Sequence, residues 1–302
     1  MIDVSIVLVN YFCSKYCADV INSIREKTYN LNYEIIVVDN SQNEDEFSKL
    51  EEINDIILID AKENLGYGKG NNLGASYSKG KYLFFLNTDT LLVNNAIFEL
   101  FSFMEKNPNV GIDGPNLFTR DLGANTSYEK KCKTIKSDAS ITGSLGKKLS
   151  RNYFHNYTNK PLQIKGYVSG AALFIRKNLF DSIGGFSKEI FMYAEESLLC
   201  YIAQKKFNVL IYNVPSAKVI HFEGASFTNA TTNRVKMFID GNYVYYKNAF
   251  GDKIAFKFLK RKIKYLNHKI VFDKLFKHKC GVKNIELERD MYKEKLLEVS
   301  KQ

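Results

Sequence analysis

A short polar turn, Asn87-Thr88-Asp89, follows the apolar run Tyr82–Leu86, which is predicted to be a strand. A turn at the end of a strand holds its carboxylate rigidly toward a crevice, where a divalent cation can bridge that carboxylate to a diphosphate. The same pattern is also typical of an Asx turn in which the aspartate is purely structural. Asp89 is therefore a candidate metal ligand whose role depends on the residues around it.

Two further segments in the first half carry polar groups at strand or helix ends. Asp39 follows the apolar run Ile35–Val38 and could accept the imide N–H of a uracil or thymine ring, although a turn or helix cap is the structural alternative. The glycine-rich segment Asn64–Asn72 leads into a predicted helix at Asn71–Ser78, and a helix N-terminus near Lys69 favours a phosphate group. This segment lacks the third glycine of a dinucleotide-binding fingerprint.

Two carboxylates and a histidine stand out in the second half. Glu195 and Glu196 begin a predicted helix, and adjacent helical side chains point about 100° apart, so one of them can face an acceptor hydroxyl and remove its proton. Acids are also common in the first turn of any helix, where they offset the helix dipole. His221 follows a predicted strand and could be a metal ligand or a structural residue.

The first 115 residues that must position these groups alternate predicted strands and helices. Val4–Asn10 and Glu34–Asp39 are nearly continuous apolar runs, typical of parallel strands covered on both faces, and Ser14 is expected to cap the helix between them. Ile56–Asp60 and Tyr82–Leu86 add two strands, and a helix follows around Ile97–Met104. This order predicts an open α/β sheet with ligands at the carboxyl ends of its strands.

Regular patterns are weaker in the second half. Phe118–Lys165 is polar, basic and irregular, and Tyr167–Ile175 then predicts a strand. A helix is expected at Glu195–Lys206, with strands at Val209–Tyr212 and Lys218–Phe222, and the rest of the chain from about Asn229 is expected to be helical.

Composition indicates a globular protein of 302 residues, because 45% of them are hydrophobic and 25% are charged. We expect neither a secretory signal at the N-terminus nor a membrane span, since no apolar run reaches about 18 residues. The five cysteines are scattered, which favours a reducing, cytoplasmic location over a disulfide scaffold.

The net charge of +10 is concentrated near the C-terminus, where Lys253–Lys279 holds ten Lys or Arg residues and one acid. Nucleic acid, an anionic membrane surface or a merely solvated helix face could each explain this run. The membrane needs the fewest extra assumptions, because apolar residues are interleaved with the basic ones. These residues are Ile254, Phe256, Phe258, Leu259, Tyr265, Leu266, Ile270, Val271, Phe272, Leu275 and Phe276.

Taken in order, the motifs resemble those of family 2 glycosyltransferases, in the branch that includes bacterial rhamnosyltransferases of cell-surface polysaccharide assembly. The resemblance covers roughly Val4 to Gly251. It is carried by Ser5–Tyr11, Val37–Ser41, Asn64-Leu65-Gly66, Gly70-Asn71-Asn72, Leu86–Thr90, Gly170-Ala171, Gly184-Gly185-Phe186, Glu195-Glu196, and His221 with Gly224 and Ser226.

This resemblance implies a GT-A fold, an open, mostly parallel sheet flanked by helices, with a helical C-terminal extension. It implies a glycosyltransferase domain at 1–250, with a nucleotide-binding half at 1–115 and an acceptor-binding half at 116–250, and a basic extension at 251–302. The nucleotide-sugar is implied to bind at Val9, Asn10, Tyr11, Asp39, Asn40, Asn64, Gly66, Lys69, Asn72, Asn87 and Thr88. The resemblance also implies that Asp89 and His221 bind the metal and that Glu196 is the base, beside Glu195. The acceptor is implied to face Gly170, Ala171 and Tyr193.

The chain departs from the family pattern in three places. Asn87 replaces the first acid of the DxD-like motif, which leaves Asp89 as its carboxylate and gives His221 a larger part. Glu196 stands in place of the family's catalytic aspartate and is one methylene longer. Leu198 and Ile202 replace an acid and an arginine, which indicates an ion pair exchanged for packing or an altered acceptor site.

We therefore expect an inverting glycosyltransferase that uses Mn²⁺ or Mg²⁺, takes a dTDP- or UDP-linked hexose such as rhamnose, and acts on a glycan, expected to be lipid-linked, at the inner face of the cell membrane. Nucleic acid is not expected as a partner. A nucleotidyltransferase that makes nucleotide-sugars is a rival, but the basic loop it needs after the first strand is replaced here by Asn10–Cys13. A non-enzymatic module that binds nucleic acid or anionic surfaces is a second rival, which leaves the strand-end acids unexplained.

Overall fold

The computed structural model describes residues 1–138, 159–222, 231–275 and 282–301. Its contacts divide the chain into two compact units. The first comprises Met1–Cys132, His155–Phe191 and Glu195–Asn229, and the second comprises Lys133–Phe154, Met192–Ala194 and Ala230–Gln302. The domain boundaries that we expected at residues 115 and 250 stay predictions.

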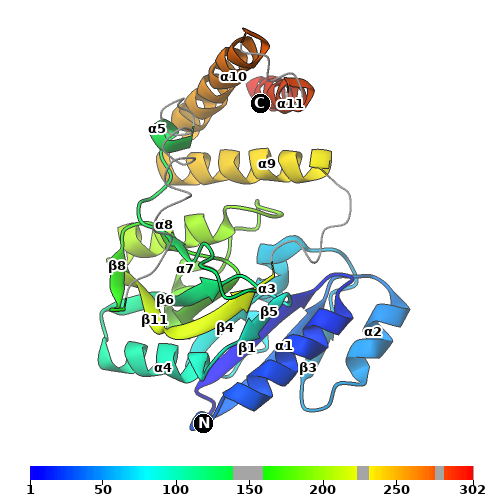
Figure 1. Cartoon of the computed structure of the whole chain (residues 1–302), viewed down its shortest axis with the longest axis vertical. Coiled ribbons are helices and arrows are strands. Elements are labelled where there is room, and N and C mark those ends of the chain that lie inside the picture. The colour runs from blue at the N-terminus through cyan, green and yellow to red at the C-terminus, as the bar shows by residue number, and fades with distance from the viewer. Residues whose placement is uncertain (139–158, 223–230, 276–281, 302) are drawn as a thin grey trace. The chain divides into compact units, whose positions relative to one another are not determined.

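The first unit is built on a mixed, mostly parallel sheet (Figure 1). Within the described residues its strand order is β3-β2-β1-β4-β10-β6-β11-β5, with β8 paired to β11. Strands β1 to β4 run parallel, β10 is antiparallel to its neighbours, and β11 is parallel to β6. The strands are β1 (Val4–Asn10), β2 (Tyr33–Asp39), β3 (Ile57–Asp60), β4 (Tyr82–Leu86), β5 (Thr90–Leu92), β6 (Val110–Phe118), β8 (Leu162–Ile164), β10 (Ala172–Arg176) and β11 (Leu210–His221), beside a separate pair β7 (Tyr128–Glu129) and β9 (Tyr167–Val168).

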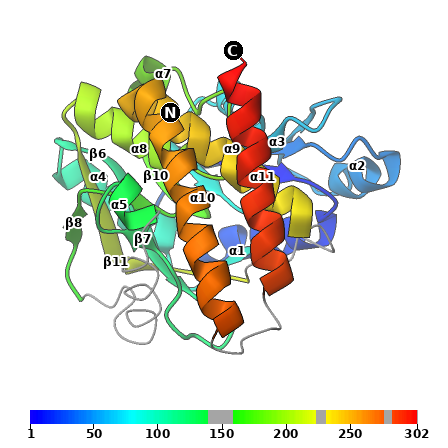
Figure 2. The ribbon, with the colours of Figure 1, turned by 90° about the horizontal axis from the view of Figure 1, so that it is seen from above.

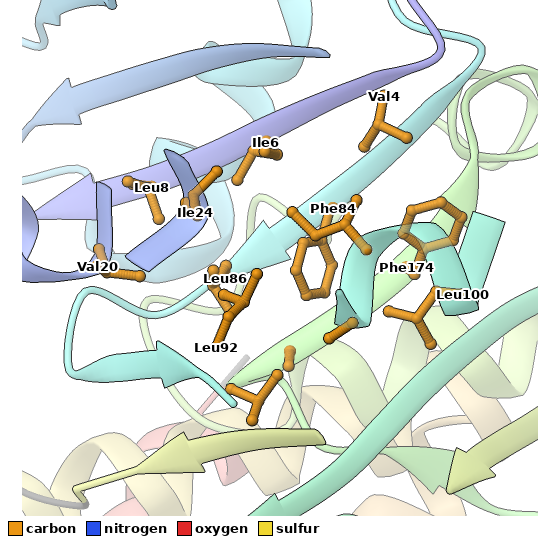
Figure 3. Close-up of a cluster of buried hydrophobic side chains, with 14 of the residues drawn as sticks. Val4, Ile6, Leu8, Val20, Ile24, Phe84, Leu86, Leu92, Leu100 and Phe174 are labelled. Carbon is orange, nitrogen blue, oxygen red and sulfur yellow. The ribbon is translucent and has the colours of Figure 1, made fainter. Parts of the chain in front are cut away.

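Helices cover both faces of this sheet, as the apolar strands require. One face packs on α1 (Ser14–Lys27), α2 (Glu44–Glu51) and α4 (Ala96–Lys106), and the other on α3 (Gly66–Ser76), α7 (Lys177–Ile183) and α8 (Glu195–Lys206). Figure 3 shows the first of these layers, in which Ile6 and Leu8 of β1 lie near Ile24 of α1. Burial of each such side chain contributes roughly 1.5–3 kcal/mol to the free energy of folding.

The start of α1 differs from the prediction that Ser14 caps it. The cap position is Cys13, which makes no side-chain cap hydrogen bond, and Ser14 is the first helical residue. The Ser14 amide and hydroxyl donate instead to the two carboxylate oxygens of Glu46 on α2, at 3.0 and 3.1 Å. A carboxylate brought by tertiary packing therefore supplies the acceptor that a capping side chain would provide.

Helix α3 begins five residues earlier than predicted, so the glycine-rich segment is mostly helical. Gly66, Gly70 and Gly74 are four residues apart and form one stripe of the helix. A Cβ at Gly74 would lie 2.5 Å from Val7 Cγ1, and one at Gly70 would lie 3.1 Å from Val9 Cγ1. Gly70 and Gly74 let α3 pack closely on the sheet, a reason that helix propensity does not reveal, whereas a Cβ at Gly66 would meet the Phe191 backbone.

The two strands predicted at Val209–Tyr212 and Lys218–Phe222 are one continuous strand, β11. Its pairing with β6 shifts register between Val214 and Lys218, around Pro215. A bulge accommodates the proline, which has no N–H to give to the ladder, without ending the strand. The irregular stretch predicted at Phe118–Lys165 lies partly outside the described residues.

The second unit is helical, with α5 (Ile135–Asp138), α9 (Thr231–Phe250), α10 (Asp252–Leu275) and α11 (Val282–Ser300). Gly251, at φ +87°, adopts the left-handed conformation that ends α9 and lets α10 begin. Helices α10 and α11 lie side by side (Figure 2), and Phe258 of α10 stacks on Tyr246 of α9 with ring centroids 4.4 Å apart. Within the described ranges, none of the helices has the length and apolarity needed to cross a membrane.

Candidate active site

Adjacent strand ends bring Asn10 and Asp39 together. The two residues are paired in the parallel register of β1 and β2, and the Asn10 amide donates to Asp39 Oδ1 at 2.8 Å. Asp39 Oδ1 also accepts from the Ser41 backbone at 3.2 Å, and Oδ2 accepts from the Ser41 hydroxyl at 2.7 Å. Asp39 is only 2% exposed, and these donors satisfy most of its acceptor capacity.

The turn after β4 meets the end of β11. His221 is paired with Thr90 in the antiparallel register of β11 and β5, and its Nε2 lies 3.3 Å from Asp89 Oδ1. The Phe222 amide donates to the Asp89 carbonyl at 2.9 Å, which ties the two segments together again. The two side chains predicted as metal ligands, 132 positions apart in the chain, therefore face each other.

The other two residues of the turn are held by the protein. The Asn87 backbone N–H donates to the Ala171 carbonyl at 2.9 Å, which joins the turn to the loop before β10. Thr88 is buried, and its hydroxyl lies 3.1 Å from the Cys13 sulfur, which in turn donates to Asn10 Oδ1 at 3.2 Å. Cys13 was not predicted as a site residue, because nothing in its sequence neighbourhood marks it.

Three asparagines predicted to bind the nucleotide-sugar make hydrogen bonds inside the first unit. Asn64 Oδ1 accepts from the Gly66 amide, and Asn40 Nδ2 donates to the Gly66 carbonyl. Asn72 bonds both the N–H and the carbonyl of Phe186, at 2.8 and 2.9 Å. These contacts give each amide a positioning role for α3, and their role in binding stays a prediction.

The remaining predicted donor contacts differ in exposure. Val9 is half-buried beneath α3, Tyr11 is 42% exposed at the end of β1, and Lys69 is half-buried on α3. Phe12, next to Tyr11, adopts φ +52°, which is uncommon for a bulky residue and turns the chain sharply between β1 and α1. These residues border the same end of the sheet as Asn10 and Asp39.

The two adjacent glutamates at the start of α8 lie in different environments. Glu195 is 2% exposed and packs on α3, where a Cβ at Gly68 would lie 3.3 Å from its Cγ. Glu196 is half-buried, and its carboxylate lies beside Gly170, where a Cβ would be 3.7 Å from Oε2. Of the pair, Glu196 is therefore the one placed beside the predicted acceptor loop. Leu198 is buried on the same helix.

Tyr67 lies among the carboxylates and was missed as a functional residue. Its hydroxyl donates to the Gly170 carbonyl, which is 103 residues away in sequence. Burial raises the pKa of the Tyr67 phenol well above its ordinary value, and Glu195, Glu196 and, more weakly, Asp89 add to the rise. An aromatic residue in a glycine-rich segment was the only sequence signal for this position.

Tyr193, predicted to face the acceptor, packs within the second unit. Its ring meets Phe238 of α9 at 6.1 Å between centroids, and the Arg234 guanidinium lies 5.8 Å from the ring centre. Tyr193 and Ala194 both have positive φ, at 72° and 76°. Gly224 and Ser226, part of the family resemblance, lie outside the described residues.

The sequence of this chain is similar to those of known glycosyltransferases. The model of the family described as Glycosyl transferase family 2 matches residues 5–184, more than half of the chain. The chain is 28% identical over 224 residues to the low-salt glycan biosynthesis hexosyltransferase Agl10 of Haloferax volcanii, covering 72% of this chain and 67% of that protein. It is 25% identical over 207 residues to the dTDP-rhamnosyl transferase RfbF of Shigella flexneri, covering 68% and 64%.

Among solved structures, the chain is similar to GalNAc-T7 crystallised with UDP, GalNAc and Mn²⁺. The TM-score is 0.56 at 16% identity, over 78% of this chain and 47% of that one. This likeness concerns the fold alone. Together with the strand order, it confirms the predicted α/β class and the GT-A type of sheet.

Proposed function

The chain belongs to glycosyl transferase family 2, and from this premise we propose that it transfers a hexosyl group, rhamnose or another hexose, from a nucleotide diphosphate to a saccharide acceptor with inversion. The observation that carries the proposal is the 3.3 Å approach of His221 Nε2 to Asp89 Oδ1, at the sheet edge that also holds Asp39. Ligands of open α/β sheets bind at this edge.

Asp89 and His221 are the residues that would hold a divalent cation, Mn²⁺ or Mg²⁺. When bound, such a cation offsets the negative charge that develops on a departing diphosphate. The pair offers one carboxylate oxygen and one imidazole nitrogen, and in the described part of the chain no group of three or more His, Cys, Asp or Glu side chains is gathered to hold a metal. Oxygens of the donor's diphosphate are therefore expected to complete the coordination.

Asp39 is proposed to select the base of the donor. Among the described residues its Oδ2 accepts one hydrogen bond, from Ser41, and so keeps capacity for the imide N–H of uracil or thymine. A UDP- or a dTDP-linked sugar would suit this arrangement equally well. The hydrogen bond from the Asn10 side chain to Oδ1 fixes the carboxylate before a ligand arrives, which lowers the cost of ordering it.

Glu196 is proposed as the base that accepts the proton of the acceptor hydroxyl. Its Oε1 accepts from the Ser197 hydroxyl at 3.0 Å, and its Oε2 points to the side where Gly170 carries no side chain. Deprotonation there strengthens the nucleophile as it approaches the anomeric carbon opposite the leaving diphosphate. A positioned base of this kind contributes roughly 10²–10⁴ in rate.

The acceptor is proposed to be a lipid-linked saccharide, reached at an anionic membrane surface through one face of α10. This helix has eight Lys or Arg residues against two acids, whereas α11 beside it has four against five. Spaced at i, i+4, i+7, i+8 and i+11, five of the exposed cations form one stripe. They are Lys253, Lys257, Lys260, Arg261 and Lys264.

Only some of the apolar residues of α10 are exposed enough to support this proposal. Phe258, Leu259, Leu266 and Ile270, which we had counted toward membrane contact, are buried within the helical unit. Val271, Phe272 and Leu275 are 57%, 55% and 72% exposed and continue the basic stripe. Phe276 lies outside the described residues. Each basic residue near an anionic membrane surface contributes about 1 kcal/mol to the free energy of membrane binding.

A vesicle flotation assay tests this membrane role. Charge reversal of Lys257, Lys260 and Lys264 to Glu is expected to abolish binding to vesicles that contain phosphatidylglycerol. The same reversal at Lys79, Lys106 and Lys188, exposed residues of the first unit, changes the net charge equally and should leave binding largely intact. Equal loss in both triple variants would contradict a specific α10 face.

The donor site is tested by a thermal-shift screen of UDP- and dTDP-sugars with Mn²⁺ or Mg²⁺. Wild-type protein should be stabilised by its donor only when the cation is present. Asp89→Ala should abolish this shift, whereas Asp60→Ala, which removes a strand-end carboxylate paired with Lys62, should keep it. If no donor stabilises the wild type, or if Asp89→Ala responds equally, the proposed donor site is wrong.

A further inference from the structure

Tyr67 connects the donor side of the first unit to three separate segments of the acceptor side. Its hydroxyl donates to the Gly170 carbonyl in the loop between β9 and β10. Its backbone amide donates to the Phe191 carbonyl at 3.0 Å, and its ring meets Phe186 edge to face with centroids 6.0 Å apart. One residue in the first turn of α3 thus fixes several parts of the loop region around Glu196.

The Tyr67 phenol serves as a hydrogen-bond donor to the Gly170 carbonyl. Burial first, and then the carboxylates of Glu195 and Glu196, raise its pKa well above the ordinary value for tyrosine. This shift favours the protonated phenol, which can donate a hydrogen bond. A neutral phenol beside two carboxylates could donate to either, yet the hydroxyl is directed to the Gly170 carbonyl.

Gly170 is a glycine that the protein's own packing does not require. Its φ is not in the left-handed region, and a Cβ there would meet Glu196 Cβ, Cγ and Oε2 at 3.7 Å, an ordinary contact distance. By contrast, a Cβ at Gly166, before β9, would lie 1.9 Å from the Glu129 carbonyl oxygen. The missing side chain at 170 instead leaves room beside the Glu196 carboxylate.

We propose that Tyr67 is a positioning residue for the acceptor: by holding the Gly170 carbonyl, it keeps the bare Gly170 backbone beside Glu196 and so defines the space in which the acceptor hydroxyl meets its base. The inference rests on the proposed sugar transfer. It assigns Tyr67 to the acceptor side although Tyr67 belongs to the segment expected to bind the donor. Because small displacements of a reacting group are costly, loss of this one hydrogen bond should affect transfer more than binding.

Tyr67→Phe tests the proposal, since it removes one oxygen and keeps the ring on Phe186. We expect kcat for transfer to fall by about 10- to 100-fold and the acceptor KM to rise, while the donor KM stays within about twofold. Hydrolysis of the donor by water should persist, so the ratio of hydrolysis to transfer should increase. Tyr82→Phe is the matched control, because the Tyr82 hydroxyl on β4 bonds Glu105 of α4 and Arg176 of β10, away from the site.

Both tyrosine variants should lower Tm by similar, small amounts, but only Tyr67→Phe should change the ratio of hydrolysis to transfer. Gly170→Ala provides a second test: it should fold normally, raise the acceptor KM and leave the donor KM unchanged. If Tyr67→Phe transfers sugar as the wild type does, or if it loses Tm without any change in that ratio, the proposal is overturned. A wild-type protein that turns over no nucleotide-sugar would instead refute the proposed function.

Discussion

The proposed donor side of the first unit, at the ends of β1, β2 and β4, and the proposed acceptor side, around Glu196, hold their polar groups in different ways. On the donor side, Asn10, Asp39 and Asp89 are 0%, 2% and 5% exposed, and each is fixed by contacts between neighbouring strand ends. On the acceptor side, Glu196 is half-buried and depends on a loop held by Tyr67. The difference indicates that the proposed donor site is built into the sheet, whereas the proposed acceptor site depends on a few long-range contacts. Substitutions of these packed groups should therefore lower the free energy of unfolding more on the donor side than on the acceptor side.

The largest expected effect is on turnover at Glu196. Glu196→Gln keeps the shape of the side chain but removes the base, so kcat for transfer should fall about 10²- to 10⁴-fold. The Kd of the donor should be unchanged, since Glu196 lies on the acceptor side. Initial rates and donor titrations measure the two quantities.

Glu195→Gln is the comparison for this variant, because Glu195 is adjacent but buried against α3. It should change stability more than it changes the rate. A loss of turnover in Glu195→Gln with near-normal rates in Glu196→Gln would reverse the roles that we assign to the two carboxylates.

Asp113 of β6 is a second buried carboxylate of the sheet, and it can be compared with Asp39. Unlike Asp39, it is fully buried with neither carboxylate oxygen hydrogen-bonded to any described residue. Burial raises the pKa of Asp113 well above its ordinary value, and Arg176 opposes this only in part. The folded state therefore keeps a proton that the unfolded state releases above about pH 4.

Stability contributed by this proton is complete below the unfolded pKa and is lost as the pH rises toward the folded pKa. In that window the free energy of unfolding should fall by up to about 1.4 kcal/mol per pH unit, relative to Asp113→Asn. Denaturant titrations of both proteins from about pH 5 to 8 measure the difference. A difference that is constant with pH would mean that Asp113 is ionised in the folded protein.

The smallest expected effect is on the free energy of unfolding when one glycine from each side is replaced by alanine. Gly74→Ala places a Cβ 2.5 Å from Val7 Cγ1, and overpacking of this kind costs about 1–3 kcal/mol of unfolding free energy. Gly170→Ala meets only ordinary contacts and should change the same quantity by less than about 0.5 kcal/mol. Equal losses in the two variants would remove the distinction between the sides.

The donor side could be predicted from sequence because its geometry follows from local rules. Apolar runs mark the parallel strands, parallel strands end at one edge, and Asn10, Asp39 and Asp89 stand at those ends. The convergence of Asp89 with His221 was expected only from the family resemblance, since no local pattern links residues so far apart in the chain.

The acceptor side could not be predicted in the same way. The hydrogen bond from Tyr67 to Gly170 joins residues 103 positions apart, and no periodicity encodes it. Sequence likewise could not tell which of Glu195 and Glu196 is buried, because that depends on the close approach of α3. In α10, the alternation of basic and apolar residues suggested a membrane face, but packing against α9 and α11 buries four of the apolar ones, Phe258, Leu259, Leu266 and Ile270.

The most direct test of the account is the anomeric configuration of the product. A single displacement, with Glu196 activating the acceptor opposite the leaving diphosphate, inverts the anomeric carbon. Incubation of the wild-type protein with its nucleotide-sugar and acceptor, followed by NMR of the purified product, should show the configuration opposite to that of the donor. Glu196→Gln should yield little or no such product. A product with the donor's own configuration would contradict the mechanism.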